Sequence, residues 1–336
     1  MDQEKEVDFV ILWVDGSDEA WQREKMKYRP DGNMPDAAAA NAAKCFRDWG
    51  TLKYWFRGVE KWAPWVRKIH FVTWGHLPAW LNTDHPKLHI VRHGEFMPEG
   101  SLPTFNSRAL ELNFHRIPGL AERFVYFNDD YFLNDRVEVR DFFKKGLPRD
   151  CAIMSPVFPE RFGTGAAQIN DLEIVNSYFG GISAVLKNKH KWFAPCYGLQ
   201  LARTFLLLPF GRMCGFYEPH LPNAFLKSTY ETVWEKEPDV LMATTFSRFK
   251  KKDNVNQWLF RYWQLMSGQF QPRSPKIGHF FDLSGDMDAV TEAMKKRKYK
   301  LVCLNDSDAI RDIEIRKEKL LRAFEELYPN KSKFER

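Results

Sequence analysis

The sequence predicts an α/β fold in which a mostly parallel, Rossmann-like sheet is joined to a helical insertion or subdomain. Over the first ~135 residues, apolar runs rich in Val and Ile alternate with amphipathic helical patterns. The second half instead holds long apolar stretches with helical spacing and few strand patterns. The 336 residues, 44% hydrophobic and 15% aromatic, are enough to bury the core of such a fold.

The individual elements follow from periodicity and from turn residues. A continuous apolar run predicts a buried strand at residues 7–14, and the apolar residues of 52–62 recur at helical steps. Between them, residues 18–45 are polar and predict a short helix and a loop. Further strands are expected at residues 68–73, 88–91, 123–127 and 300–304, and further helices at 107–115 with Ser107 as cap, 258–270 and 313–328.

Charge and cysteine content exclude some classes of protein. The net charge of +6 comes from 50 basic and 44 acidic residues, largely interspersed, which weakly favours anionic ligands. The basic runs 250–252 and 295–298 are interpreted as solvated faces, so no nucleic acid is expected as a partner. Five widely spaced cysteines lack zinc or disulfide patterns and are interpreted as reduced thiols, mostly in the core: Cys45, Cys151, Cys196, Cys214 and Cys303.

The same considerations predict a cytoplasmic location, with the inner face of the cell membrane as a second position. The polar start of the chain does not resemble a secretory signal, and the longest apolar run, 204–210, is too short to span a bilayer. The apolar segment 199–210, which has Arg203 and Arg212 beside it, is expected to be a buried core helix. The alternative is that it rests on a membrane surface.

Acidic turns follow three of the expected strands, and they are the main candidates for a site. They are Asp15-Gly16-Ser17-Asp18, Asn128-Asp129-Asp130 and Asn305-Asp306. In open α/β sheets the ligand crevice lies outside the carboxyl ends of the strands, so these acids are expected to converge and to suit a hard cation such as Mg²⁺ or Mn²⁺. The alternative is that Asp and Asn simply form turns there.

Two further groups suit phosphate chemistry. His220 lies between Pro219 and Pro222, which limit how the imidazole is presented, and histidine can transfer protons or attack phosphorus near neutral pH. Arg248 and Lys250 begin a cationic run that could neutralise phosphate oxygens in a transition state. A structural histidine and a solvated lysine loop are the alternatives.

Four blocks of the sequence, in order and spanning nearly the whole chain, resemble the Stealth proteins. This family includes bacterial capsular polysaccharide phosphotransferases and resembles the catalytic part of animal lysosomal-enzyme N-acetylglucosamine-1-phosphotransferase. The blocks are Asp8 to Asp18, a long second block from Phe46-Arg47-Asp48 through Arg57 and Leu102-Pro103-Thr104 to Asn128-Asp129-Asp130, a third at His220-Leu221-Pro222, and a fourth from Cys303-Leu304-Asn305-Asp306 to Glu335.

The resemblance implies a glycosyltransferase-A-like fold and one catalytic unit over residues 1–336. Residues 1–150 would bind the nucleotide-sugar, 151–235 would form a helical, acceptor-side part, and 236–336 would complete the active site. The implied reaction transfers a hexose-1-phosphate, for example N-acetylglucosamine-1-phosphate, from a nucleotide-diphosphate sugar, a UDP-sugar in the first instance. The acceptor is an oligosaccharide or polysaccharide hydroxyl, and a nucleoside monophosphate is released during capsule or cell-surface polysaccharide synthesis.

By the same resemblance, Asp129, Asp130 and His220 are catalytic, and Asp129 and Asp306 hold the metal. The residues expected to bind the nucleotide-sugar are Asp15, Gly16, Asp18, Asp48, Arg57, Asn128, Arg248, Lys250 and Asn305. The third block departs from the family where Lys250 replaces an arginine, which leaves open whether Arg248 or Lys250 contacts phosphate.

The reaction itself has alternatives. Asp130 or His220 could remove the acceptor proton, or His220 could form a phosphohistidine first. A metal-dependent glycosyltransferase would share the strand-end acids but release a nucleoside diphosphate, and a carbohydrate-binding protein could display the aromatic residues without catalysis.

Overall fold

The computed structural model describes residues 6–28, 47–158 and 164–336. Its strands run in this order: β1 (Val7–Leu12), β2 (Ile69–Thr73), β3 (Leu88–Arg92), β4 (Arg123–Phe127), β5 (Tyr131–Leu133), β6 (Phe143–Lys144), β7 (Leu147–Asp150), β8 (Asn223–Leu226), β9 (Gln271–Pro272), β10 (Gly278–Asp282) and β11 (Leu301–Asn305).

The α-helices of the described chain cover both halves of the protein. They are α1 (Glu19–Tyr28), α3 (Leu52–Trp62), α4 (Ser107–Glu111), α5 (Val139–Phe142), α6 (Gly165–Phe179), α7 (Ile182–Lys187), α8 (Lys189–Trp192), α9 (Leu201–Leu207), α10 (Lys227–Lys236), α11 (Pro238–Thr245), α12 (Trp258–Ser267), α13 (Met287–Lys295) and α14 (Ile313–Leu327). Short 3₁₀ helices are η3 (His93–Glu95), η4 (Phe114–Arg116), η5 (Pro195–Gln200), η6 (Leu208–Phe210) and η7 (Pro275–Ile277).

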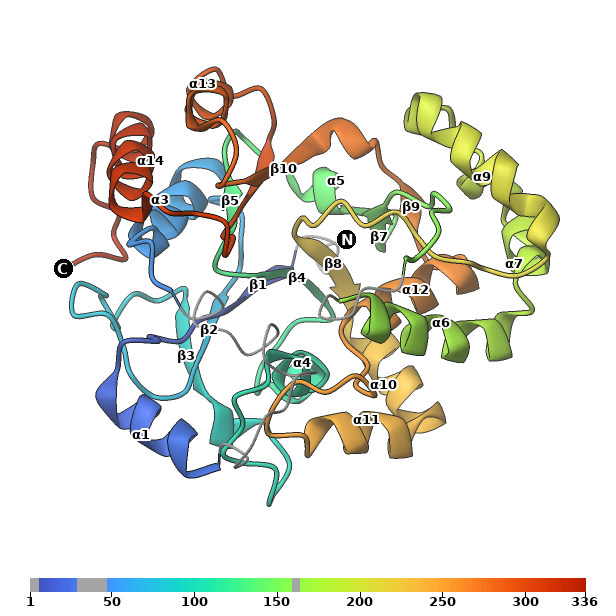
Figure 1. Ribbon diagram of the computed structural model, residues 1–336, viewed down its shortest axis with the longest axis horizontal. Coiled ribbons are helices and arrows are strands. Elements are labelled where there is room, and N and C mark those ends of the chain that lie inside the picture. Colours follow the sequence, from blue (N-terminus) through green and yellow to red (C-terminus); the bar gives the residue numbers. More distant parts are fainter. Residues whose placement is uncertain (1–5, 29–46, 159–163) are drawn as a thin grey trace.

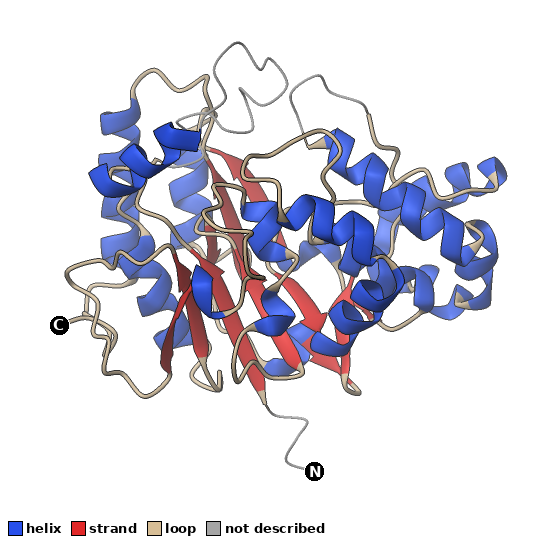
Figure 2. Cartoon of the chain, turned by 90° about the horizontal axis from the view of Figure 1, so that it is seen from below, coloured by secondary structure: helices blue, strands red, loops and turns tan. Residues whose placement is uncertain are grey.

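A five-stranded sheet of order β3-β2-β1-β4-β8 forms the centre of the molecule, with helices on both faces (Figure 2). Strands β3, β2, β1 and β4 are parallel, and β8 closes the edge antiparallel to β4. A second sheet of order β10-β11-β5 and a small one of order β6-β7-β9 lie outside it. The expected α/β fold with a mostly parallel sheet is therefore confirmed.

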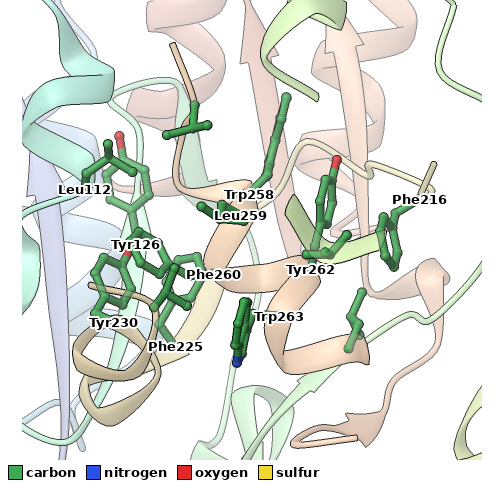
Figure 3. Packing of buried hydrophobic residues seen from close by; sticks show 14 of the residues in the cluster. Leu112, Tyr126, Phe216, Phe225, Tyr230, Trp258, Leu259, Phe260, Tyr262 and Trp263 are labelled. Atoms are coloured by element: carbon green, nitrogen blue, oxygen red, sulfur yellow. The ribbon is translucent and has the colours of Figure 1, made fainter. Parts of the chain in front are cut away.

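The two faces of the central sheet support two hydrophobic cores. Alternate residues of a strand point to opposite faces, so Val10 of β1 belongs to one core and its neighbours Phe9 and Ile11 to the other. The first core gathers residues of α6, α7, α8, α10, α11 and α12. Figure 3 shows its rings of Tyr126, Phe225, Tyr230 and Phe260 close together. The second core packs α3, α13, α14 and the sheet β10-β11-β5 against the other face, as the left side of Figure 1 shows.

Several expected elements have the observed bounds or nearly so. Helix α3 and strand β4 coincide with the expectations, while β1 ends at Leu12 and α12 at Ser267. The helix expected at 107–115 is shorter, because α4 ends at Glu111 and is followed by η4. Its cap is Asn106, whose side chain accepts a hydrogen bond from the Arg108 amide, and not Ser107.

The segment 18–45 is described only in part, and so is the set of cysteines. Helix α1 accounts for the short helix expected within 18–45. From position 29 onward that segment, with Cys45, lies outside the described residues, which resume at position 47. Of the described cysteines, Cys151 and Cys303 are buried, Cys214 is half-buried and Cys196 is exposed, and all are free thiols.

Candidate functional site

A cavity of about 270 Å³ lies where the carboxyl ends of β1, β4 and β11 meet. The turn after β4 contributes Asn128, Asp129 and Asp130, and the end of β11 contributes Asn305 and Asp306. Its remaining lining residues are Trp13, Val14, Arg47, Asp48, Trp49, Thr51, Leu52, Phe132, His220, Lys250, Leu283, Leu304 and Leu320. The cavity is therefore rich in carboxylates and also contains cations.

Two of the three acidic turns meet in this cavity as the sequence predicts. Strand β5 directly follows Asp130 and pairs antiparallel with β11, and the Leu304 amide donates a hydrogen bond to the Asp130 carbonyl at 2.9 Å. This ladder brings Asp306 into the same cavity as Asp129 and Asp130, although β11 belongs to the second sheet. The convergence thus depends on a sheet junction and not on one open sheet.

The third acidic turn is arranged differently. Trp13 and Val14 carry the end of β1 into the cavity, but Asp15, Gly16 and Asp18 are not among its lining residues. The Asp15 carboxylate accepts hydrogen bonds from Ser17, and the Asp18 carboxylate accepts one from the Trp21 amide at 2.7 Å, at the start of α1. These contacts agree with the alternative that Asp15 and Asp18 form the turn after β1.

Asp129 and Asp130 have strongly perturbed acidity. Asp129 is exposed as a residue, yet its carboxylate is crowded by protein atoms, and this desolvation, with the charge of Asp48, raises the pKa of Asp129 to about 6. Desolvation and the neighbouring Asp129 charge raise the pKa of Asp130 to about 7. One Asp130 oxygen, Oδ1, is buried without a hydrogen-bond partner. Asp130 is thus placed to exchange a proton near neutral pH.

His220 lies close to Asp130 and is held by rigid surroundings. Asp130, His220 and Cys303 each place one atom that could bind a metal within 4.8 Å of the other two. The rings of Tyr131 and Phe280 lie nearly perpendicular to the imidazole at centroid distances of 5.4 and 5.5 Å, and burial lowers the pKa of His220 to about 4. His220 is therefore a neutral imidazole at physiological pH.

A buried arginine holds the segment that presents His220. Arg261 of α12 donates a hydrogen bond to Glu218, two residues before His220, at 2.6 Å, and makes a bidentate pair with Asp150 at 2.6 and 3.0 Å. His220 itself has a φ of 50°, a left-handed conformation that is unfavourable for histidine. The Arg261 cluster supplies the fixed contacts that such a backbone requires.

The structure separates Arg248 from Lys250. Lys250 lines the cavity, and its charge lowers the otherwise raised pKa of Asp129. Arg248 is exposed and outside the lining, with its guanidinium 4.6 Å from the ring centre of Tyr28. Of the two cations, Lys250 is the one that can meet a ligand in the cavity.

Arg57, which was expected to bind the nucleotide-sugar, makes its contacts outside the cavity. Its guanidinium makes a bidentate ion pair with Glu335, at 2.8 Å for each bond, and donates a further hydrogen bond to the Tyr328 carbonyl at 2.7 Å. These contacts tie α3 to the C-terminal segment, and Arg57 does not line the cavity.

Arg47, Trp13 and Trp49 line the cavity although the sequence did not assign them a role. Arg47 donates a hydrogen bond to Asp306 at 2.9 Å, across 259 positions of sequence. The signal that could have found Arg47 was its place beside Asp48 in the second block that resembles the Stealth proteins. The two tryptophans are nearly buried, and each presents part of its surface to the cavity.

The oxygen atoms of the cavity fit a hard divalent cation better than the Asp130–His220–Cys303 group does. Burial raises the pKa of the Cys303 thiol well above its usual range, and its Sγ donates to Asp130 at 3.4 Å, so Cys303 is a protonated donor and not a thiolate ligand. By contrast, Asp306 Oδ2 and Asp130 Oδ1 are buried oxygens without a hydrogen-bond partner. Carboxylate oxygens are the ligands that Mg²⁺ and Mn²⁺ prefer.

Fold and site together define an α/β protein with an acidic cavity at the carboxyl ends of its strands. Comparison with known sequences then gives the family. Residues 5–32 match the description "Stealth protein CR1, conserved region 1" and residues 45–150 match "Stealth protein CR2, conserved region 2". This chain belongs to the Stealth family, and it is a transferase.

Full-length relatives support this assignment. A capsular polysaccharide phosphotransferase of Streptococcus pneumoniae, WcwK, is 44% identical over 98% of this chain and 99% of its own length. The receptor polysaccharide phosphotransferase WefC of Streptococcus oralis is 44% identical with the same coverage. The exopolysaccharide phosphotransferase cps2G of Lactiplantibacillus plantarum is 38% identical over 98% of this chain and 96% of its own length.

A solved galactosyltransferase, LgtC, aligns over 95% of both chains with a TM-score of 0.40 and 10% identity. In the described part of the chain, none of the helices is both long and apolar enough to cross a bilayer.

Proposed function

We propose that this protein transfers a hexose-1-phosphate from a nucleotide-diphosphate sugar to a carbohydrate hydroxyl in the synthesis of a capsule or another cell-surface polysaccharide. The observation that carries the proposal is the meeting of Asp129, Asp130, His220 and Lys250 in one cavity of a chain whose full-length relatives are named polysaccharide phosphotransferases. The donor sugar in the first instance is a UDP-sugar such as UDP-N-acetylglucosamine.

The proposed chemistry is an in-line attack of the acceptor oxygen on the β-phosphorus of the donor. The new bond joins the acceptor oxygen to that phosphorus, and the bond to the bridging oxygen breaks, so that a nucleoside monophosphate leaves with the bridging oxygen. The sugar keeps its bond between C1 and oxygen and hence its anomeric configuration. Such a reaction needs a base for the hydroxyl proton and compensation for phosphate charge.

Asp130 is the proposed base. A pKa of about 7 matches proton transfer near neutral pH better than the pKa of about 4 of His220. His220, a neutral imidazole near Asp130, would orient the acceptor hydroxyl by a hydrogen bond. Attack by His220 itself, through a phosphohistidine, is the alternative that rapid-quench trapping of labelled donor without acceptor would reveal.

Lys250 and Arg47 would bind the phosphates. Among the lining residues, these two cations stand against four carboxylates, Asp48, Asp129, Asp130 and Asp306, so a pyrophosphate cannot enter without further positive charge. We propose that Asp129 and Asp306 hold a Mg²⁺ or Mn²⁺ ion, which would neutralise the pyrophosphate when bound. Asn128, Asn305 and Asp48 would contact the nucleotide-sugar beside it.

Identification of the released nucleotide tests the proposal. Purified full-length protein is incubated with a panel of nucleotide-sugars, acceptor oligosaccharides and Mg²⁺ or Mn²⁺, and the products are separated by chromatography. We expect an acceptor-dependent nucleoside monophosphate and a product that gains a sugar-phosphate by mass. A nucleoside diphosphate, with a product that gains the sugar alone, would instead identify a metal-dependent glycosyltransferase.

A further inference from the structure

The surface around α9 combines exposed apolar side chains with an unusual charge pattern. Four large apolar residues project there: Leu199 is 96% exposed, Leu206 75%, Phe210 72% and Phe205 56%. They come from three consecutive short elements, η5, α9 and η6, which lie with α7 at the end of the molecule remote from α13 and α14 (Figure 1). We call these four residues the α9 apolar surface.

This surface is part of the folded structure and not a loosely attached segment. Thr204, on the opposite side of α9, is fully buried, and its hydroxyl accepts a hydrogen bond from the Met154 amide at 3.1 Å. Leu201, Leu207 and Leu208 pack against the first core. The expectation of a buried core helix at 199–210 is therefore correct for one side only. Because the helix is held from within, the outward residues stay exposed at a fixed position.

The charge of the surrounding chain is one-sided. Residues 174–217 contain no Asp or Glu, whereas 44 acidic residues in 336 would place about six in a stretch of this length. The same stretch holds Lys187, Lys189, Lys191, Arg203 and Arg212, and all but Lys191 are exposed. Exposed apolar groups on a stretch of chain that carries cations and no acidic residue are complementary to an anionic lipid surface, where the apolar groups enter the acyl boundary and the cations meet the headgroups.

We propose that the α9 apolar surface docks this protein onto an anionic lipid bilayer. A second copy of the chain is a poorer partner, because a two-fold interface built on this surface would bring Arg203 and Arg212 close to the same residues of the other copy. Insertion of short elements from one face requires no membrane-spanning helix. The docking is independent of the reaction proposed above.

Vesicle co-sedimentation of the full-length protein tests the docking. Vesicles of phosphatidylcholine mixed with phosphatidylglycerol are compared with vesicles of phosphatidylcholine alone, at low and high salt. We expect binding to the anionic vesicles that weakens as salt rises, since the cations are solvent-exposed. The double variant L206S/F210S should bind at least ~10-fold more weakly, and R203Q/R212Q should lose the preference for anionic lipid.

The matched control is Ile315→Ser, which removes a side chain that is 68% exposed on α14, away from this surface. It should bind vesicles like the unchanged protein. All variants should keep their melting temperatures, because the altered side chains are exposed. Absent binding, equal binding by L206S/F210S, or a dimer in solution that L206S/F210S dissociates would each overturn the proposal.

Discussion

As the proposed base, Asp130 must be ionised to accept a proton, yet its surroundings disfavour the charge, so in this proposal activity and stability make opposite demands on the residue. We expect Asp130→Asn to lower kcat by at least ~10²-fold and to stabilise the fold by about 1 to 2 kcal/mol at pH 8, after allowance for water in the cavity. The raised pKa makes ionisation costly in the folded state only, so the gain is full above pH 7 and disappears below pH 4.

Steady-state kinetics and thermal unfolding at pH 8 and pH 4 measure both effects. Asp282→Asn is the matched control, because Asp282 also ends a strand but does not line the cavity. Its kcat should not change. A destabilised but active Asp130→Asn protein would contradict the proposed role.

The pH dependence of the reaction follows from the same carboxylates. Asp129 and Asp130 interact and titrate as a pair, so kcat/KM reports apparent pKa values of the pair. We expect kcat/KM to rise between pH 5 and 7 and to level off above about pH 7, because the base must be deprotonated. His220, with a pKa of about 4, stays neutral across this range. A rate that falls from pH 6 to pH 8 would instead indicate an essential protonated group.

Lys250 and Arg248 offer a direct test of phosphate contact. Lys250→Met should lower kcat/KM for the donor by about 10²-fold, because a cation facing developing phosphate charge is lost. Arg248→Met should change it by less than ~3-fold, since Arg248 lies outside the cavity lining and rests on Tyr28. Donor-dependent kinetics of both variants decide the matter, and a larger loss for Arg248→Met would reverse the assignment.

At the residue scale, the sequence could predict groups that lie at the ends of strands but not pairs made across the fold. Asn128, Asp129, Asp130, Asn305 and Asp306 follow apolar strands, and the cavity contains all five. The Arg47–Asp306 pair joins residues 259 positions apart, and nothing local marks it. Asp15 and Asp18 carry the same strand-end pattern, yet their carboxylates make turn and helix-cap contacts.

At the element scale, a buried ion pair between Arg57 and Glu335 ties α3 to the C-terminal segment. The Arg57 and Glu335 side chains are only 6% and 4% exposed. Removing one partner leaves the other charge buried, so Arg57→Ala should destabilise the protein by about 3 to 5 kcal/mol. Urea unfolding measures the loss, and Lys61→Ala on the same helix is the control with a smaller effect. At low temperature, the activity per folded molecule of Arg57→Ala should equal that of the unchanged protein. A loss of activity in the folded variant would show that Arg57 does contribute to nucleotide-sugar binding.

Long, strongly periodic elements were predictable, and short ones paired over long distances were not. Helix α3 has the predicted bounds because its apolar residues recur every three or four positions and Ala63-Pro64 ends the pattern. Strand β8 has four residues, and β5 has three, too few to show a period. Strand β10 is largely exposed and is defined by its parallel pairing with β11, which local sequence does not reveal.

At the scale of the whole molecule, the two cores cross the three parts expected from the sequence. Residues from each of the ranges 1–150, 151–235 and 236–336 contribute to both hydrophobic cores. Strand β8 completes the central sheet from the middle range, and α14 covers its second core from the last range. The ranges therefore share their packing, which supports the expectation of a single unit over residues 1–336.

We accordingly expect residues 1–150, produced alone, not to fold cooperatively. In this fragment the edge of β4 that pairs with β8 would be exposed. The apolar surface that α12 and α14 bury would be exposed as well. Circular dichroism during heating should show no cooperative transition for the fragment and one dominant transition for the full chain. Adding residues 151–336 as a separate chain should restore cooperative melting if the cores reassemble. A fragment 1–150 that melts cooperatively by itself would show an autonomous domain and would contradict the shared-core interpretation.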